Sequence, residues 1–262
     1  MSGCRGAAIT DTVNVAGSTT ILPIAEVAAE NFMQQNDEIS VLVSGMGSSA
    51  GIEAVMSGTA DIGTSSRNLK EGEGEGLVDI PIAYDGIAAI VNPDNPVNSI
   101  TTEQLRGIYS GEITNWSEVG GEDLPIDLIN RDESSGTRDA FASNVMDESH
   151  FDVGAVILPG TGQVREVVAR SRGAIGYISV GYVEPRFGTR PVKALILDGV
   201  EPTDENVALG VYPISRVLHF FTKGEPEGAT KQYVDYILSD EVQLGAVIQA
   251  GYLPVSTIEG GQ

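Results

Sequence analysis

The residues that could do chemistry gather in one segment of the chain, NRDESSGTRDAF at 130–141. The guanidinium of Arg131 carries forked N–H donors that match the oxygens of a tetrahedral oxyanion. The small hydroxyl residues around Gly136 allow the backbone to approach a ligand closely. The segment therefore predicts an anion-binding loop that either binds its ligand or also transforms it.

Two other segments share this composition, AGSTT at 16–20 and GMGSSAG at 45–51. Each follows an apolar stretch and precedes a helical pattern, and the first N–H groups of a helix have no partner within it, so they suit an oxyanion. Any single junction is also ordinary, because Ser, Thr and Gly are common in helix caps and turns. Three such junctions in one chain, one of them with arginines, favour an anion site.

The sequence offers little for catalysis. Its two histidines, His150 and His219, neighbour no nucleophile-elbow serine, and the Walker A and HExxH patterns are absent. Cys4 is the only cysteine, so neither an internal disulfide nor a paired-cysteine metal site can form. We therefore expect a binding protein rather than an enzyme, without a cofactor or a metal.

The overall charge limits the partners. The formal net charge is −22, which argues against nucleic acid as a ligand. An anion approaching such a protein is repelled at long range, so the site must work through short-range donors. No apolar run approaches the roughly 18–20 residues that a membrane span needs.

The order of the expected elements indicates the fold. Strands at 13–18, 39–47 and 61–67 alternate with helices at 19–36 and 48–60, which is typical of an open parallel α/β sheet. Long β runs at 78–96 and 212–224 enclose a complete second α/β unit. The pattern predicts two domains with two crossings, the first domain being built from both ends of the chain. Ligands of open α/β sheets lie beyond the carboxyl ends of the strands, so a cleft between the domains is expected.

Several ordered motifs resemble the phosphate-binding proteins of phosphate-specific ABC transporters, from about residue 13 to about residue 256. They are AGSTTILPIAEVAAENF, GMGSSAGIEAVMSGTADIGTSSR, DGIAAIVNPDNP, ITNWSEVGG, NRDESSGTRDAF, GAIGYISVGYV and YPISRVLHFFTKG. The resemblance implies an α/β, two-lobed type II periplasmic-binding-protein fold with two hinge crossings and a ligand cleft between the lobes. The expected division is an N-terminal tether at 1–12, lobe I at 13–87 and 195–262, and lobe II at 88–194.

The resemblance also implies which residues bind phosphate, namely Thr19, Thr20, Ser48, Ser66, Arg131, Ser135, Gly136 and Thr137. Glu133 occupies the position of an acid that braces the arginine. One departure concerns the aspartate that accepts a hydrogen bond from protonated phosphate in well-known members, because Ser66 stands at its position here. Either Ser66 or Asp85, on the first crossing strand, then takes the role of proton acceptor.

The resemblance finally implies partners and location. We expect an exported monomer that hands inorganic phosphate to the permease subunits of an ABC transporter. Ser2-Gly3-Cys4 reads as the end of a lipoprotein signal, so Cys4 is the expected lipid anchor on the extracellular face of the membrane. The alternatives are another tetrahedral oxyanion (sulfate, arsenate or molybdate), a phosphatase-type enzyme, and a sensor or adhesion role at the cell surface.

Overall fold

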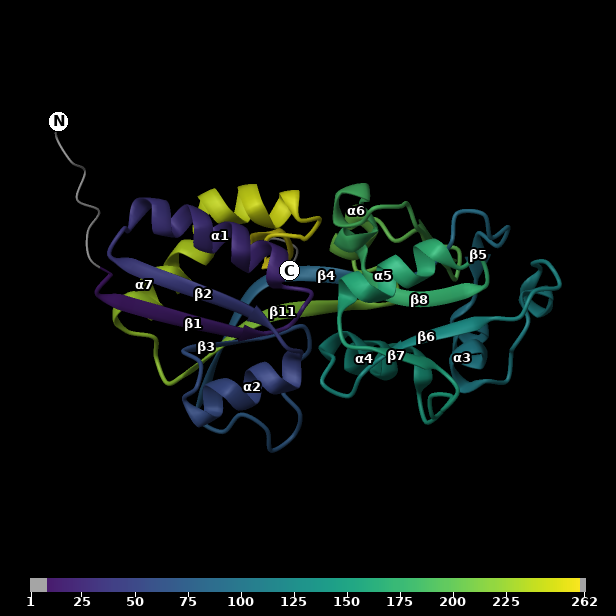
Figure 1. Ribbon diagram of the computed structural model, residues 1–262, viewed down its shortest axis with the longest axis horizontal. Helices are drawn as coiled ribbons and strands as arrows, with labels where there is room; N and C mark the ends of the chain where they lie inside the picture. The colour runs from purple at the N-terminus through teal and green to yellow at the C-terminus, as the bar shows by residue number, and fades with distance from the viewer. Residues whose placement is uncertain (1–8, 260–262) are drawn as a thin grey trace.

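The computed structural model describes residues 9–259 of the chain, so Cys4 lies outside the described residues. Two lobes lie side by side and share one sheet (Figure 1). Its strand order is β2-β1-β3-β11-β4-β8-β6-β7, with β9 paired to β4. No helix among residues 9–259 is both long and apolar enough to cross a membrane.

The first lobe contains three parallel strands and one antiparallel neighbour. These strands are β1 (Asp11–Gly17), β2 (Ile39–Gly45), β3 (Ile62–Ser65) and β11 (Ser215–Lys223). Its helical segments are α1 (Leu22–Gln35), α2 (Ser48–Ser57), α7 (Gly228–Ile237), the π-helix η5 (Val242–Val247) and the C-terminal α8 (Ser256–Glu259). Phe220 packs with α1 and α7, whereas Phe221 packs with α2. Adjacent side chains of a strand point to opposite faces, so helices cover both faces of this half of the sheet.

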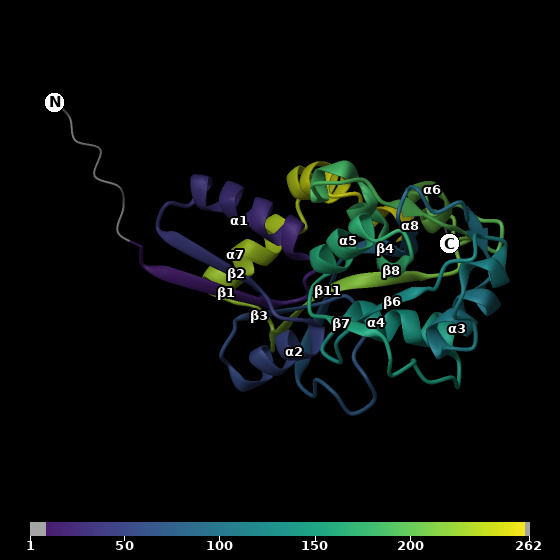
Figure 2. The same ribbon diagram turned by 45° about the vertical axis from the view of Figure 1, so that its right-hand side comes forward.

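The second lobe is a further α/β unit with helices on both faces (Figure 2). Its strands are β5 (Ser99–Ile100), β6 (Asp127–Arg131), β7 (Val156–Leu158), β8 (Ala174–Ser179), β9 (Lys193–Ala194) and β10 (Ile196–Leu197). Its α-helices are α3 (Thr102–Ser110), α4 (Gly136–Phe141), α5 (Thr161–Arg170) and α6 (Asp204–Ala208). Shorter turns are the 3₁₀ segments η1 (Trp116–Val119), η3 (Val180–Val183) and η4 (Pro185–Phe187) and the π-helix η2 (Ala142–Met146).

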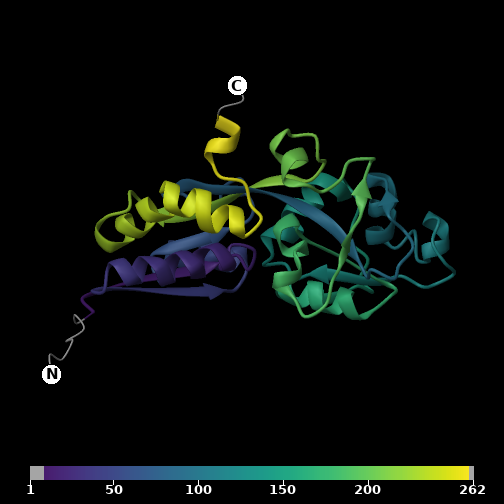
Figure 3. The ribbon, with the colours of Figure 1, turned by 90° about the horizontal axis from the view of Figure 1, so that it is seen from above.

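The long strand β4 (Leu77–Val91) joins the lobes. Its residues 77–86 pair with β11, and its residues 87–91 pair with β8. In the second half, Ile87 and Ala89 enter the core beside α3 and α4, while Ala88 and Ile90 enter the core beside α5. The strand is therefore buried on both faces, which explains its long uninterrupted apolar run. Figure 3 shows β4 and β11 passing together between the lobes.

Two expected boundaries differ from the structure. The return to the first lobe occurs at Ser215, which pairs with Gly86, rather than at residue 195. The intervening apolar side chains belong to the core of the second lobe, including those of Leu195, Leu197, Val207, Tyr212 and Ile214. At the N-terminal end, β1 already pairs with β2 at Asp11, so the expected tether does not extend to residue 12.

The expected helix at 19–36 begins later, at Leu22. Residues 18–21 form a turn instead, in which the Thr20 N–H donates to Ser18 Oγ at 3.2 Å and the Ile21 N–H donates to the Ser18 carbonyl at 3.2 Å. The turn leaves Thr19 and Thr20 between the end of β1 and the start of α1. This arrangement presents both hydroxyls at the edge of the lobe.

Candidate anion-binding site between the lobes

The three junctions that the sequence singled out meet where the lobes face each other. The loops after β1 and β2 come from the first lobe, and the loop after β6 comes from the second. The resemblance implied eight ligand residues, and all of them except the half-buried Thr19 are buried here. Seven of them lie against residues of the opposite lobe at the carboxyl ends of the strands, namely Thr19, Thr20, Ser48, Ser66, Arg131, Gly136 and Thr137.

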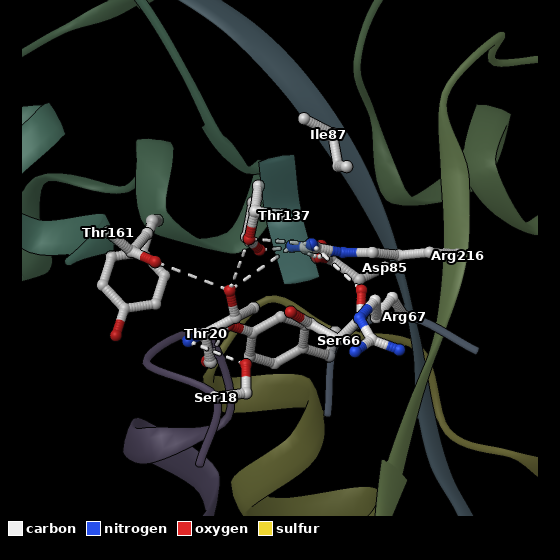
Figure 4. A network of polar contacts seen from close by, with 12 residues as sticks. Ser18, Thr20, Ser66, Arg67, Asp85, Ile87, Thr137, Thr161 and Arg216 are labelled. Carbon is white, nitrogen blue, oxygen red and sulfur yellow. Dashed lines mark hydrogen bonds and ion pairs between the residues drawn. The ribbon is translucent and has the colours of Figure 1, made fainter. Parts of the chain in front are cut away.

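Threonine hydroxyls form contacts across this space (Figure 4). Thr20 Oγ1 lies 3.1 Å from Thr137 Oγ1 and 3.5 Å from Thr161 Oγ1. Thr19 Oγ1 lies 3.1 Å from Thr161 Oγ1. Because Thr19 and Thr20 belong to the first lobe and the other two to the second, these contacts hold the lobes in a closed arrangement.

Arg131 is held by backbone carbonyls. Its Nε donates to the Leu158 carbonyl at 3.1 Å and its Nη2 to the Pro159 carbonyl at 2.9 Å. Its remaining donors reach the hydroxyls of Thr161 at 3.3 Å and Thr19 at 3.4 Å. Burial lowers the pKa of Arg131, and the charge of Arg216 lowers it further. The guanidinium thus faces the hydroxyl cluster, and among the described residues it makes no ion pair with a carboxylate.

The prediction that Glu133 braces Arg131 is wrong. The Glu133 side chain is exposed. Asp132 Oδ1 accepts hydrogen bonds from the Ser134 N–H at 2.9 Å and the Ser134 hydroxyl at 2.7 Å, and this turn directs the intervening residue outward. Carbonyl oxygens do the bracing instead.

A second group of small residues packs beside the threonines. The Ser66 N–H donates to Ser48 Oγ at 3.1 Å, and the two serine hydroxyls lie 3.3 Å apart. A Cβ atom at Gly136 would lie 2.3 Å from Ser48 Oγ and 2.8 Å from Ser66 Oγ. Only glycine therefore allows the second lobe to approach this closely. Ser135 caps α4, its Oγ accepting from the Arg138 N–H at 3.1 Å.

A buried ion pair adjoins the threonines. Arg216 donates from Nε and Nη2 to Asp85 Oδ2, at 2.9 Å and 2.7 Å. Ser179 Oγ donates to Asp85 Oδ1 at 2.7 Å, and Arg216 Nη1 donates to Thr137 Oγ1 at 2.8 Å. Burial raises the pKa of Asp85, while Arg216 and Ser179 oppose that shift. Figure 4 shows Arg216 between Asp85 and Thr137.

Sequence reasoning missed Arg216, Thr161 and Ser179. The signal for Arg216 was a basic residue inside the apolar run YPISRVLHFF, since a charge in a buried strand requires a partner. Thr161 and Ser179 carry no comparable signal, because a single hydroxyl at the end of a strand or the start of a helix is ordinary.

A second set of charges also crosses between the lobes. Arg67 Nε lies 2.9 Å and Lys70 Nζ 2.8 Å from Asp139 Oδ2 on α4. Arg67 additionally donates to both carboxylate oxygens of Glu73, at 2.6 Å and 2.9 Å. Arg67, Lys70, Asp139 and Arg216 border a cleft of about 740 Å³ between the lobes, which lies beside the threonine cluster and is not lined by it.

Two α/β lobes joined by two adjacent crossing strands, with polar groups of both lobes converging between them, define the class of two-lobed solute-binding proteins. Residues 5–241 match the family model described as the PBP superfamily domain. The phosphate-binding protein PstS of Bacillus subtilis is 38% identical over 250 residues, which cover 94% of this chain and 82% of the relative. The PstS protein of Borreliella burgdorferi is 31% identical over 254 residues, covering 94% and 90%.

Solved structures agree with this relationship. A phosphate ABC transporter substrate-binding protein from Clostridium perfringens, with bound phosphate, superposes with a TM-score of 0.87 at 40% identity, covering 93% of this chain and 99% of that one. An ABC-type phosphate transport receptor from Vibrio cholerae gives 0.75 at 35% identity, covering 92% and 99%. The chain belongs to the PBP superfamily and, within it, to the family of PstS-like phosphate-binding proteins.

Proposed function

We propose that this protein binds inorganic phosphate between its two lobes and delivers it to the permease subunits of an ABC transporter. The observation that carries the proposal is the convergence of Arg131 with buried hydroxyls from both lobes. Such a site presents hydrogen-bond donors that match tetrahedral oxygens. Membership of the PstS-like family supports phosphate as the particular anion.

The proposed ligands come from both lobes. The first lobe contributes Thr19, Thr20, Ser48 and Ser66, and the second contributes Arg131, Ser135, Gly136 and Thr137. An anion bridging the two sets stabilises the closed arrangement over an open one, which is the usual way in which a ligand shifts a hinge equilibrium. Binding and lobe closure are then a single event, and the protein acts as a carrier rather than an enzyme.

We propose that Ser66 Oγ accepts the hydrogen bond from protonated phosphate, because both carboxylate oxygens of Asp85 already accept hydrogen bonds. A hydroxyl can donate as well as accept, so it does not repel a fully deprotonated anion as a carboxylate would. A site with a dedicated acceptor can discriminate by on the order of 10⁴–10⁵. We expect weaker discrimination here, and sulfate should compete measurably with phosphate in a displacement titration.

The location follows from the same role. A receptor for a phosphate permease works on the outer side of the cell membrane, and we propose that Cys4 carries a lipid anchor there and that the protein is a monomer. Metabolic labelling of the expressed precursor with a fatty-acid probe, compared with a Cys4→Ser variant, tests the anchor. Labelling that persists in the variant would contradict it.

The central test is calorimetric titration of phosphate into wild type and Arg131→Ala. Removing one member of a buried charged interaction costs 2–5 kcal/mol or more, so affinity should fall by about 30-fold to more than 1,000-fold at about 1.4 kcal/mol per tenfold. Arg170→Ala is the matched control, since Arg170 is 61% exposed and, within residues 9–259, its ion pair is with Glu166 on its own helix. Unchanged affinity in a folded Arg131→Ala variant would contradict the assignment.

The same titration separates the alternatives. Preference for sulfate or molybdate over phosphate would redirect the proposal to another oxyanion, whereas arsenate should compete under either reading. Steady turnover of a generic phosphoester would favour a phosphatase.

A further inference from the structure

We propose that Arg216 is a second guanidinium ligand of the bound anion and that Asp85 serves to position it; this inference rests on the proposed phosphate site. Arg216 lies on the crossing strand β11, whereas Arg131 ends β6 in the second lobe. The two arginines reach the same hydroxyl cluster from different elements.

The hydrogen bonds of Arg216 go to three kinds of acceptor, and one of these is the Ser66 carbonyl, which Nη1 reaches at 3.3 Å. Nε and Nη2 are committed to Asp85 Oδ2, at 2.9 Å and 2.7 Å. The donors that face the cluster go to Thr137 Oγ1 at 2.8 Å and, more weakly, to Thr20 Oγ1 at 3.4 Å. These hydroxyls are themselves proposed phosphate ligands. An anionic oxygen is a stronger acceptor than a neutral hydroxyl, so phosphate would take over these donors.

The contacts form one continuous path between the arginines. Arg131 Nη1 reaches Thr161 at 3.3 Å, Thr161 lies 3.5 Å from Thr20, Thr20 lies 3.1 Å from Thr137, and Thr137 accepts from Arg216 at 2.8 Å. Phosphate seated on these three hydroxyls would therefore have a guanidinium at each end. A single-arginine site offers no such symmetry.

Charge supports the same conclusion. Arg131 and Arg216 are 2% and 8% exposed, and Asp85 is the one carboxylate that pairs directly with either of them among the described residues. Two buried cations and one buried anion leave a surplus of one positive charge. Burial is the main cause of the lowered pKa of Arg131, and the charge of Arg216 adds a smaller contribution. An anion bound beside the two arginines would offset this buried positive charge directly. The acidic residues behind the net charge of −22 are spread over the whole chain and act on it more weakly.

The geometry of Asp85 explains its role. Its Oδ2 accepts twice from Arg216, and its Oδ1 accepts from Ser179 of β8 in the second lobe. The carboxylate thereby orients the guanidinium plane toward Thr137 without itself touching the hydroxyl cluster. Asp85 is a positioning residue, and the anion contacts belong to Arg216.

The test is phosphate and sulfate calorimetry on wild type, Arg216→Met, Asp85→Asn and the Arg216→Met/Asp85→Asn double variant, with thermal unfolding of each ligand-free protein. Arg216→Met should lose at least about 30-fold in phosphate affinity and also lose stability, because it leaves Asp85 buried without its cation. The double variant should recover the thermal midpoint but remain within about tenfold of Arg216→Met in affinity. Asp85→Asn should keep the wild-type phosphate-to-sulfate ratio.

Two further variants separate the charge of Arg216 from its shape and provide a control. Arg216→Lys retains the charge and loses the planar fork, so it should fold normally and bind at least about tenfold more weakly. Arg172→Met is the matched control, because Arg172 is 51% exposed and lies away from the cleft beside Glu122; its affinity should not change.

Other outcomes overturn the inference. Wild-type affinity in the double variant would mean that Arg216 only neutralises Asp85. Loss of discrimination against sulfate in Asp85→Asn would make Asp85 the proton acceptor. Wild type that binds no phosphate would instead refute the proposed function, whereas a defect confined to the Arg216 variants, with Arg131→Ala behaving as expected, bears on Arg216 alone.

Discussion

Replacing Gly136 with alanine should prevent the lobes from closing while leaving each lobe intact. Gly136 opens α4 in the second lobe, and its backbone is not in the left-handed region, so alanine is conformationally permitted. The added methyl group would meet Ser48 and Ser66, both in the first lobe. The clash therefore exists only when the lobes are together.

The size of the effect follows from the contact distances. The Cβ of alanine would lie 2.8 Å from Ser48 Cβ, whereas ordinary contacts of this kind are 3.4–4 Å. Rotating the Ser48 hydroxyl removes the 2.3 Å clash with Oγ but cannot move its Cβ, which is attached to the backbone of α2. Overpacking of this kind costs about 1–3 kcal/mol. Because the cost falls only on the closed state, phosphate affinity should drop by about 5- to 150-fold.

The assay is calorimetric titration of phosphate together with small-angle scattering of the ligand-saturated protein. Gly136→Ala should bind more weakly and close less completely, with the thermal midpoint of the ligand-free protein unchanged. Gly245→Ala is the control, since an added Cβ there has no heavy atom within 4 Å. Wild-type affinity in Gly136→Ala would refute the reasoning, and so would a large fall in the ligand-free midpoint, because that would place the clash within one lobe.

Two further predictions concern the charges at the rim of the cleft. Asp139→Asn removes both cross-lobe ion pairs, with Arg67 and Lys70. Phosphate affinity should therefore fall by about fivefold at low salt and by less at high salt, which titrations at two ionic strengths would show. A loss of affinity that does not depend on salt would contradict the ion-pair account. The hydrogen bond from Arg67 holds the pKa of Glu73 below its ordinary value of 4.5, so its stabilising effect is complete above that pH and is lost as the pH falls through the lower folded-state pKa. Glu73→Gln should therefore unfold in urea with a shallower loss of stability between pH 6 and pH 3 than wild type, and equal slopes would rule out this role.

Local sequence patterns predicted most of the fold because helices, strands and turns depend mainly on neighbouring residues. The strand, small-residue turn and helix at each junction are encoded within about twenty neighbouring residues, and the uninterrupted apolar run of β4 reflects burial on both faces. The second crossing was misplaced because the apolar side chains of Leu195 and Ile214 fit either core equally well by pattern. Only packing decided that both belong to the second lobe.

The site divides in the same way. Thr20, Ser48 and Thr137 could be proposed from sequence, because small hydroxyl residues at helix starts are recognisable without partners. Glu133 was misassigned because the direction of a side chain within a turn depends on the hydrogen bonds of its neighbours, here those of Asp132 and Ser134.

By itself, the sequence determined that this protein has an α/β architecture and which loops carry the clustered hydroxyl residues and Arg131, since those features depend on local composition and spacing. The tertiary structure alone decided that Arg216, distant in sequence from both Asp85 and Thr137, joins them in one buried cluster. It also decided that Gly136 must lie against Ser48 for the lobes to close. These contacts between residues distant in sequence depend on how the two lobes meet beside the strands β4 and β11. Local sequence patterns do not predict that arrangement.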